Sequence, residues 1–100
     1  DLAEIDGLLE SHEAVKEVAV CSYPDERLGE RICACVVPTD AAQAPTVQSL
    51  AVFLQAAGLA KYKMPERVEL FKQLPRNALG KVLRFELQQQ TANRMAQVIS

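Results

Sequence analysis

Two valine- and cysteine-rich runs, separated by a short turn, constrain the fold of this chain more than any other feature. In residues 15–23, Val18 and Val20 alternate with the small apolar Ala19 and Cys21, which predicts a strand that is apolar on both faces and internal to a sheet. Proline and glycine in residues 24–29 supply turn chemistry, so residues 30–37 should form a second strand, antiparallel to the first.

The remaining elements follow from apolar periodicity and end signals. Residues 2–11 predict an amphipathic helix, and Thr46 predicts the N-cap of a second helix over residues 47–57 that ends at Gly58. Residues 67–71 alternate as in a half-exposed third strand. After a loop over residues 76–81, helical periodicity resumes from Val82 to Leu87, and residues 88–100 are expected to be a frayed polar tail.

Together these elements predict one α+β domain over residues 1–100, with a mostly antiparallel three-stranded sheet packed against helices. The longest uninterrupted apolar run, residues 32–37, is far too short for a membrane span, and the N-terminal residues do not resemble a signal peptide. The three cysteines lack metal-site spacing, and Cys33 and Cys35 should share one buried strand face. We therefore expect a cytoplasmic protein with no metal site.

Charge is distributed unevenly along the chain. Residues 1–30 carry nine acidic and two basic side chains, a net −7, whereas residues 61–100 carry eight basic and three acidic ones, a net +5. A polyanion such as a nucleotide would be drawn to the basic part. Equally, the two parts could face each other within the molecule. The N-terminal acids themselves are expected to be solvated, and these are Glu4, Asp6, Glu10, Glu13 and Glu17.

Gly80 and Lys81 are the residues that chemistry singles out, because a flexible glycine beside a long cation lets an ammonium group reach a phosphate or carboxylate. The loop is not a Walker A motif, which would need a glycine at Pro75 and a hydroxyl residue at Val82. A solvated surface lysine is the alternative. No serine or cysteine hydrolase arrangement is present, and the sparse aromatic residues make RNA binding a minor hypothesis, so no nucleic-acid partner is expected.

Several sequence blocks, in order, resemble the C-terminal domain of adenylate-forming enzymes, the superfamily of acyl- and aryl-CoA synthetases, luciferases and peptide-synthetase adenylation domains. The blocks are residues 4–5, 11–15, 24–31, 33–38, 61–65 and 74–84. The run Leu79-Gly80-Lys81-Val82-Leu83-Arg84 differs from the run typical of peptide synthetases. Residues 61–65 and 75–79 are similar to the corresponding segments of CoA ligases of the aryl and chlorobenzoate type. The chain also opens directly into a helix, as a fragment of a longer enzyme would.

This resemblance implies a catalytic role for Lys81, which in the family contacts the substrate carboxylate and the ATP α-phosphate. Arg76, Asn77 and Gly80 are expected to support its loop. The resemblance also implies a CoA-docking surface, expected at Arg27, Leu28, Tyr62 and Lys63. ATP and CoA would be co-substrates, with magnesium bound through ATP in an N-terminal adenylation domain that this chain lacks. Alone, the chain should therefore be inactive.

Two alternatives stay open at this point. The domain could be a non-catalytic nucleotide-binding or interaction module with the same fold, or the lid of an enzyme that loads a carrier protein in place of CoA. Leu79 also departs from the serine or threonine that many relatives carry there. The identity of the carboxylic acid is not encoded in this chain, because the acid pocket should lie in the missing domain.

Overall fold

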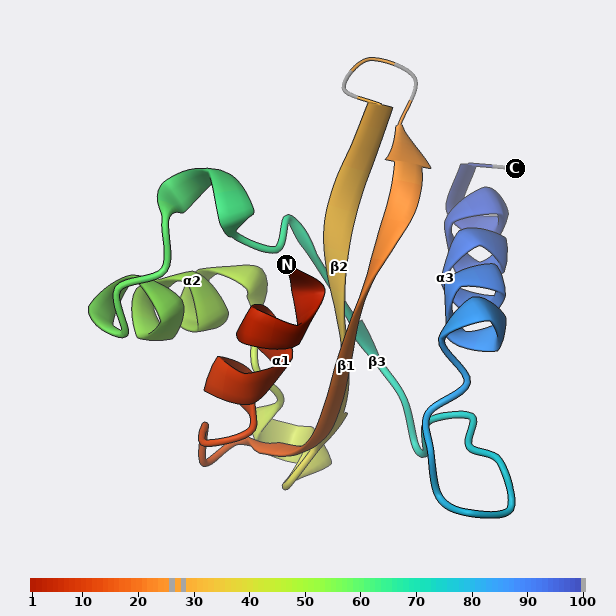
Figure 1. Cartoon of the computed structure of the whole chain (residues 1–100), viewed down its shortest axis with the longest axis horizontal. Helices are drawn as coiled ribbons and strands as arrows, with labels where there is room; N and C mark the ends of the chain where they lie inside the picture. The colour runs from red at the N-terminus through yellow and green to blue at the C-terminus, as the bar shows by residue number, and fades with distance from the viewer. Residues whose placement is uncertain (26, 28, 100) are drawn as a thin grey trace.

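A three-stranded sheet separates two layers of helices (Figure 1). The computed structural model describes residues 1–25, 27 and 29–99. Its elements in chain order are α1 (Leu2–Leu9), β1 (Val15–Asp25), β2 (Gly29–Pro38), the 3₁₀ helix η1 (Ala41–Gln43), α2 (Val47–Ala56), the 3₁₀ helix η2 (Lys61–Lys63), β3 (Arg67–Leu70) and α3 (Arg84–Ile99). The α+β class and the mostly antiparallel sheet are confirmed.

The β1–β2 hairpin forms the long side of the sheet. It pairs in antiparallel register from Val15 opposite Pro38 to Asp25 opposite Gly29, and β3 adds to β2 in parallel from Arg67 opposite Cys33. The strand order is β1-β2-β3, so the expectation that the first strand is internal is wrong. β1 is an edge strand that is apolar on both faces because α1 packs on one face and α3 on the other (Figure 1).

Each face of the sheet has its own core. On the α1 and α2 face the buried residues are Ile5, Leu9, Val15, Val20, Ala34, Val36, Leu50, Leu54 and Leu59. On the α3 face they are Ala19, Cys21, Tyr23, Cys33, Cys35, Val37, Phe71, Leu74 and Leu87. Because side chains alternate along a strand, neighbours such as Val20 and Cys21 enter different cores.

The three cysteines are free and buried on the α3 face. This confirms that Cys33 and Cys35 share one strand face. The Cys35 sulfur lies 3.8 Å from that of Cys21 and 3.4 Å from the hydroxyl of Thr91 in α3. The hydrogen-bonding contact with Cys21, together with burial, raises the pKa of the Cys33 thiol and raises the pKa of Cys35 to about 12. Both thiols are therefore protonated at neutral pH and act as small core residues.

Helix α2 begins where the sequence indicates. The Thr46 hydroxyl accepts a hydrogen bond from the Ser49 backbone N–H, and the Ser49 hydroxyl accepts one from the Thr46 N–H, which completes a capping box. At the other end, Gly58 adopts a φ of +91°, the left-handed conformation that glycine favours. The predicted helix over residues 47–57 is thus confirmed to within one residue.

Helix α3 differs most from the prediction. It begins at Arg84, two positions later than expected, and it continues to Ile99 over most of the predicted frayed tail. Most of its surface is polar, but one narrow face packs on the sheet. This face consists of Leu87, Thr91 and Met95, which are spaced four residues apart. The Arg94 guanidinium also lies 3.8 Å from the centre of the Phe71 ring. None of the described helices is both long and apolar enough to cross a bilayer.

Candidate functional site

The loop over residues 76–82, here called the Lys81 loop, connects Pro75 to the residues that precede α3. It is a closed structure, because Arg76 and Val82 form an isolated antiparallel bridge and the Leu83 N–H donates to the Pro75 carbonyl at 2.9 Å. In Figure 1 it lies below α3, at the end of the molecule away from the β1–β2 turn. Its two stems therefore leave the body of the domain side by side.

Asn77 organises the interior of the Lys81 loop. Its side-chain oxygen accepts hydrogen bonds from the backbone N–H groups of Leu79 and Lys81, both at 2.9 Å. Its backbone N–H donates to the Lys81 carbonyl at 2.9 Å, and its carbonyl accepts from the Gly80 N–H at 3.0 Å. Gly80 completes the turn with a φ of +87°, which is unfavourable for residues with a Cβ atom. The loop shape is thus set by polar contacts within it.

Arg76 ties the first stem of the loop to the sheet. One guanidinium nitrogen, Nη1, donates to the Gly80 carbonyl at 2.7 Å. The other two, Nη2 and Nε, contact the Glu17 carboxylate in β1 at 2.6 and 3.2 Å. Glu17 was predicted to be a solvated acid, and the structure shows instead that it anchors this arginine.

Arg84 ties the second stem to the same strand. Its Nη1 donates to the Val20 carbonyl at 2.8 Å, and its Nη2 pairs with the Asp6 carboxylate in α1. The other Asp6 oxygen accepts from the Val20 N–H at 2.7 Å. Asp6 is only 8% exposed, so its prediction as a solvated acid is wrong. Its spacing from Leu2 and Leu9, four and three residues away on one helical face, is the sequence signal that indicates burial.

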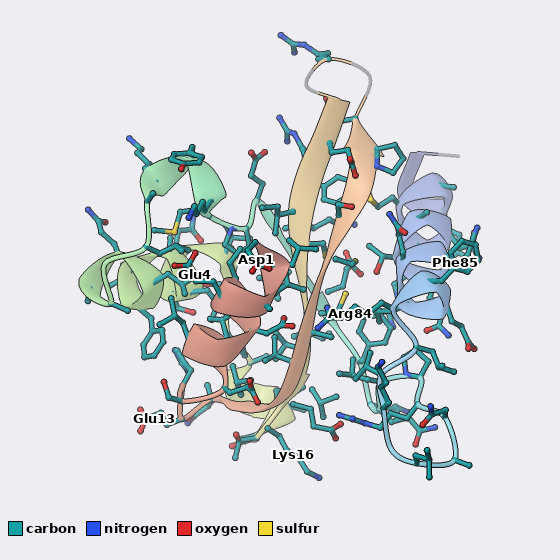
Figure 2. All side chains as sticks on the ribbon, in the orientation of Figure 1. Asp1, Glu4, Glu13, Lys16, Arg84 and Phe85 are labelled. Carbon is teal, nitrogen blue, oxygen red and sulfur yellow. The ribbon has the colours of Figure 1, made fainter. Side chains whose placement is uncertain are left out.

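The ammonium group of Lys81 makes no hydrogen bond or ion pair with any residue in the described part of the chain, and its side chain is exposed. It borders a shallow depression lined by Asn77, Lys81, Val82, Leu83, Arg84 and Phe85. Two large apolar side chains flank it, since Leu79 is 94% exposed and Phe85 is 79% exposed. Figure 2 shows Phe85 pointing away from the sheet, whereas Arg84 points toward β1. The loop can therefore present a cation and an apolar rim to another surface.

The residues predicted to dock CoA are spread over two places. Tyr62 in η2 is 84% exposed, and the neighbouring Lys63 ammonium lies 3.2 Å from the Glu4 carboxylate and 5.9 Å from the Tyr62 ring centre. The hydrogen bond that Lys63 donates to the Glu4 carboxylate raises the pKa of Lys63. Arg27 is exposed in the β1–β2 turn, which Figure 1 places apart from η2, and Leu28 lies outside the described residues. Within this chain the structure does not bring Arg27 and Tyr62 into one site.

Charge pairing across the chain accounts for part of the sequence asymmetry. Among the residues that the structure describes, three ion pairs join the acidic N-terminal residues to the basic C-terminal part, and these are Glu4–Lys63, Asp6–Arg84 and Glu17–Arg76. The intramolecular interpretation is therefore correct for these three cations. Lys81 is not among them, so its positive charge is available to a ligand.

One further concave surface was not predicted from the sequence. It lies between α2 and η2 and is lined by Ala51, Gln55, Leu59, Lys61 and Met64. Its walls are mostly apolar, with a lysine at the rim. Among the residues that the structure describes, no group of three His, Cys, Asp or Glu side chains is arranged to hold a metal ion.

Comparison with known proteins gives consistent matches over most of the chain. The family model described as the AMP-binding enzyme C-terminal domain matches residues 4–81. The chain is 38% identical over 92 residues to the 2,3-dihydroxybenzoate-AMP ligase of Bacillus subtilis (strain 168), covering 92% of this chain and 17% of the ligase. It is 44% identical over 91 residues to the 2-succinylbenzoate–CoA ligase of Geobacillus sp. (strain WCH70), covering 91% of this chain and 18% of that enzyme.

A solved structure of similar fold is the Mycobacterium tuberculosis fatty acyl CoA synthetase. It superimposes with a TM-score of 0.78 and 35% sequence identity, over 88% of this chain and 17% of that one. The chain thus spans about a sixth of the length of the relatives it matches.

Proposed function

Because the chain belongs to the family of AMP-binding enzyme C-terminal domains in the adenylate-forming superfamily, we propose that it is the mobile C-terminal lid of an ATP-dependent, AMP-forming acyl- or aryl-CoA ligase. Its relatives are about six times longer. The sites for ATP and the carboxylic acid would accordingly belong to an N-terminal adenylation domain of a longer polypeptide. The observation that carries this proposal is the unpaired Lys81 ammonium on a rigidly bonded, exposed loop.

In the first step, a carboxylate oxygen of the acid forms a bond to the α-phosphorus of ATP, the α–β phosphoanhydride bond breaks, and pyrophosphate leaves. Two anions must approach each other in this reaction. Lys81 would contact both the carboxylate and the α-phosphate and so offset their repulsion as the transition state forms. Magnesium would enter with ATP as its counter-ion. The exposed Leu79 and Phe85 would meet the adenylation domain around this contact.

In the second step, the domain would rotate and present another surface to the acyl-adenylate. The CoA sulfur forms a thioester bond to the acyl carbon, and AMP leaves with the bonding electrons of the mixed anhydride. Tyr62 and Lys63 in η2, with Arg27 between β1 and β2 and its sequence neighbour Leu28, are the residues we propose for docking the CoA nucleotide. The exposed Tyr62 ring would stack on adenine, Arg27 would contact a phosphate, and Lys63 would exchange its Glu4 contact for a phosphate.

The test is the variant Lys81→Ala in the complete enzyme that carries this domain. Acid-dependent exchange of pyrophosphate into ATP measures the first step, and thioester formation from a supplied acyl-adenylate measures the second. Dihydroxybenzoate, succinylbenzoate and fatty acids, the acids named for the relatives, form the first substrate panel. We expect adenylation to fall by about 10²–10³, or roughly 3–4 kcal/mol of transition-state stabilisation, while thioester formation is much less affected.

Lys72→Ala is the matched control, because Lys72 is exposed and has no side-chain partner among the described residues. It should leave both steps unchanged. Equal loss of both steps in Lys81→Ala would refute the separation of roles that we assign to this lysine.

A second acceptor is supported by one observation, namely that a relative is named as an AMP ligase and not as a CoA ligase. An adenylation domain that loads a carrier protein would use the same Lys81 chemistry and a different thiol. Supplying the acyl-adenylate with either CoA or a pantetheinylated carrier protein distinguishes the two. A non-catalytic module would support neither transfer and no pyrophosphate exchange.

A further inference from the structure

The peptide unit that leads into Lys81 is held at both of its polar ends. Its carbonyl, that of Gly80, accepts from Arg76 Nη1 at 2.7 Å, and its N–H, that of Lys81, donates to the Asn77 side chain at 2.9 Å. Fixing both ends sets the orientation of the peptide plane. It therefore sets the direction in which the Lys81 side chain leaves the loop.

Arg76 can fix the Gly80 carbonyl only if its own guanidinium is fixed. Glu17 provides this, because its Oε1 atom accepts from both Nε and Nη2 of Arg76, at 3.2 and 2.6 Å. The guanidinium group is planar and rigid, so holding one edge determines where the remaining nitrogen, Nη1, points. Glu17 belongs to β1, in which Val15 and Val20 are buried in one core and Ala19 in the other. The carboxylate thus connects the loop to the rigid sheet.

We propose that Glu17 is a positioning residue for Lys81, acting through Arg76 and the Gly80 carbonyl. This inference rests on the proposed role of Lys81 in adenylation. Glu17 does not touch the reacting atoms. It makes one orientation of the lysine persist in the absence of substrate, and that reduces the ordering required when the lid closes for the first step.

The competing explanation is that the Glu17–Arg76 ion pair only stabilises the fold. The exposure of the pair argues against this explanation. The Arg76 and Glu17 side chains remain 37% and 30% exposed, and ion pairs in such positions contribute little to folding stability. By contrast, a displacement of a reacting group by about an ångström can reduce a rate by about a hundredfold. The two explanations therefore predict different measurements.

The experiment compares Glu17→Gln with the parent in the complete enzyme. Glutamine has the same shape but no charge, so it weakens the hold on Arg76 without removing side-chain volume. We expect adenylation to fall by about tenfold, with thioester formation from supplied acyl-adenylate and the thermal unfolding midpoint close to the parent values. Glu13→Gln is the matched control, since Glu13 loses the same charge but has no side-chain partner among the described residues. An unchanged adenylation rate, or an equal loss in both steps, overturns the proposal.

Arg76→Gln gives a second and independent test at an exposed position, for the case in which Glu17→Gln folds poorly. If Glu17 acts only through Arg76, adding Glu17→Gln to Arg76→Gln will produce no further loss of adenylation, whereas two independent contributions will multiply. Multiplying losses overturn the proposal. Lys81→Ala assayed in parallel separates the two levels of inference. If it retains full adenylation, the proposed function fails, and if it loses adenylation while Glu17→Gln does not, only the positioning inference fails.

Discussion

The Lys81 loop and the η2 segment are both basic, and both are tied to helix α1 by a carboxylate, but the lysines are used differently. At the loop, arginines on its two stems make the anchoring contacts, Arg84 with Asp6 and Arg76 with Glu17 of β1, and the lysine has no side-chain partner among the described residues. In η2, Lys63 itself pairs with Glu4. The lysine of a basic segment can therefore either be exposed for binding a ligand or form an ion pair within the protein. Only the contacts in the structure distinguish the two.

The two anchors on α1 also differ in burial. Asp6 is 8% exposed and bonds both Arg84 and the Val20 N–H, whereas the Glu4 side chain is 48% exposed and pairs with Lys63. Val20 lies on the edge strand of the sheet, and both of its backbone polar groups are hydrogen-bonded to side chains. Its N–H donates to Asp6, and its carbonyl accepts from Arg84. Asp6 therefore supports the fold and the loop together, whereas Glu4 serves only a surface segment.

Removing the buried anchor should give the largest effect on stability. In Asp6→Ala the buried Val20 N–H loses its acceptor, and the half-exposed Arg84 loses its carboxylate partner while keeping its bond to the Val20 carbonyl. We expect a loss of about 2 kcal/mol in the free energy of unfolding, which lowers the midpoint by about 10 °C in a domain of this size. Thermal unfolding followed by circular dichroism measures it. Glu10→Ala, at an exposed position following the same helix, should change little, and equal losses in the two variants would contradict the assignment.

Replacing Asn77 tests whether the hydrogen bonds inside the Lys81 loop hold Lys81 in position, without disturbing either core. Asn77→Ala deletes the acceptor for the Leu79 and Lys81 N–H groups. Because the loop is exposed, we expect little change in unfolding but a loss of about tenfold in adenylation, or about 1.4 kcal/mol. Pyrophosphate exchange in the complete enzyme provides the rate. Asn77→Asp keeps an acceptor oxygen and should retain most adenylation activity. If it loses as much activity as Asn77→Ala, the hydrogen bonds accepted by the Asn77 side chain do not position Lys81.

On the other side of the comparison, Tyr62→Ala tests whether η2 docks the nucleotide. The ring is 84% exposed and packs in no core, so stability should not change. Loss of stacking on adenine should raise the KM for CoA by about three- to tenfold and leave adenylation intact. Initial rates at varied CoA concentration give the KM. Tyr62→Phe retains the ring and should behave as the parent, and an unchanged KM in the alanine variant would remove Tyr62 from the docking surface.

Local sequence signals predicted the parts of the fold that short-range chemistry determines. The β1–β2 hairpin, the Thr46 cap and the loop that carries Lys81 all follow from residues close together in the chain. The resemblance to a family added the expected role of Lys81. A solvated Lys81 was one of the interpretations of the sequence, but neither source predicted that its neighbours Arg76 and Arg84 would both be engaged in ion pairs.

What the sequence did not reveal depends on partners far apart in the chain. The Glu17–Arg76 and Asp6–Arg84 pairs join residues separated by 59 and 78 positions, so no local pattern indicates them. The length of α3 was missed because its inward stripe includes a polar threonine that only the cysteine cluster explains. The edge position of β1 was missed because helices, and not strands, cover both of its faces.

The smallest expected effect concerns the exposed pair in η2. The hydrogen bond that Lys63 donates to the Glu4 carboxylate raises the pKa of Lys63 above its ordinary value of 10.5. A raised folded-state pKa stabilises the fold fully below pH 10.5, and this contribution disappears as pH rises through the folded-state pKa. Glu4→Gln should therefore bring the Lys63 pKa back toward 10.5, as measured by NMR titration of the lysine side chain, whereas Glu13→Gln should not shift it. If the Lys63 pKa does not change in Glu4→Gln either, Glu4 does not hold the Lys63 ammonium group in solution. The contrast between a paired Lys63 and an unpaired Lys81 among the described residues is then wrong.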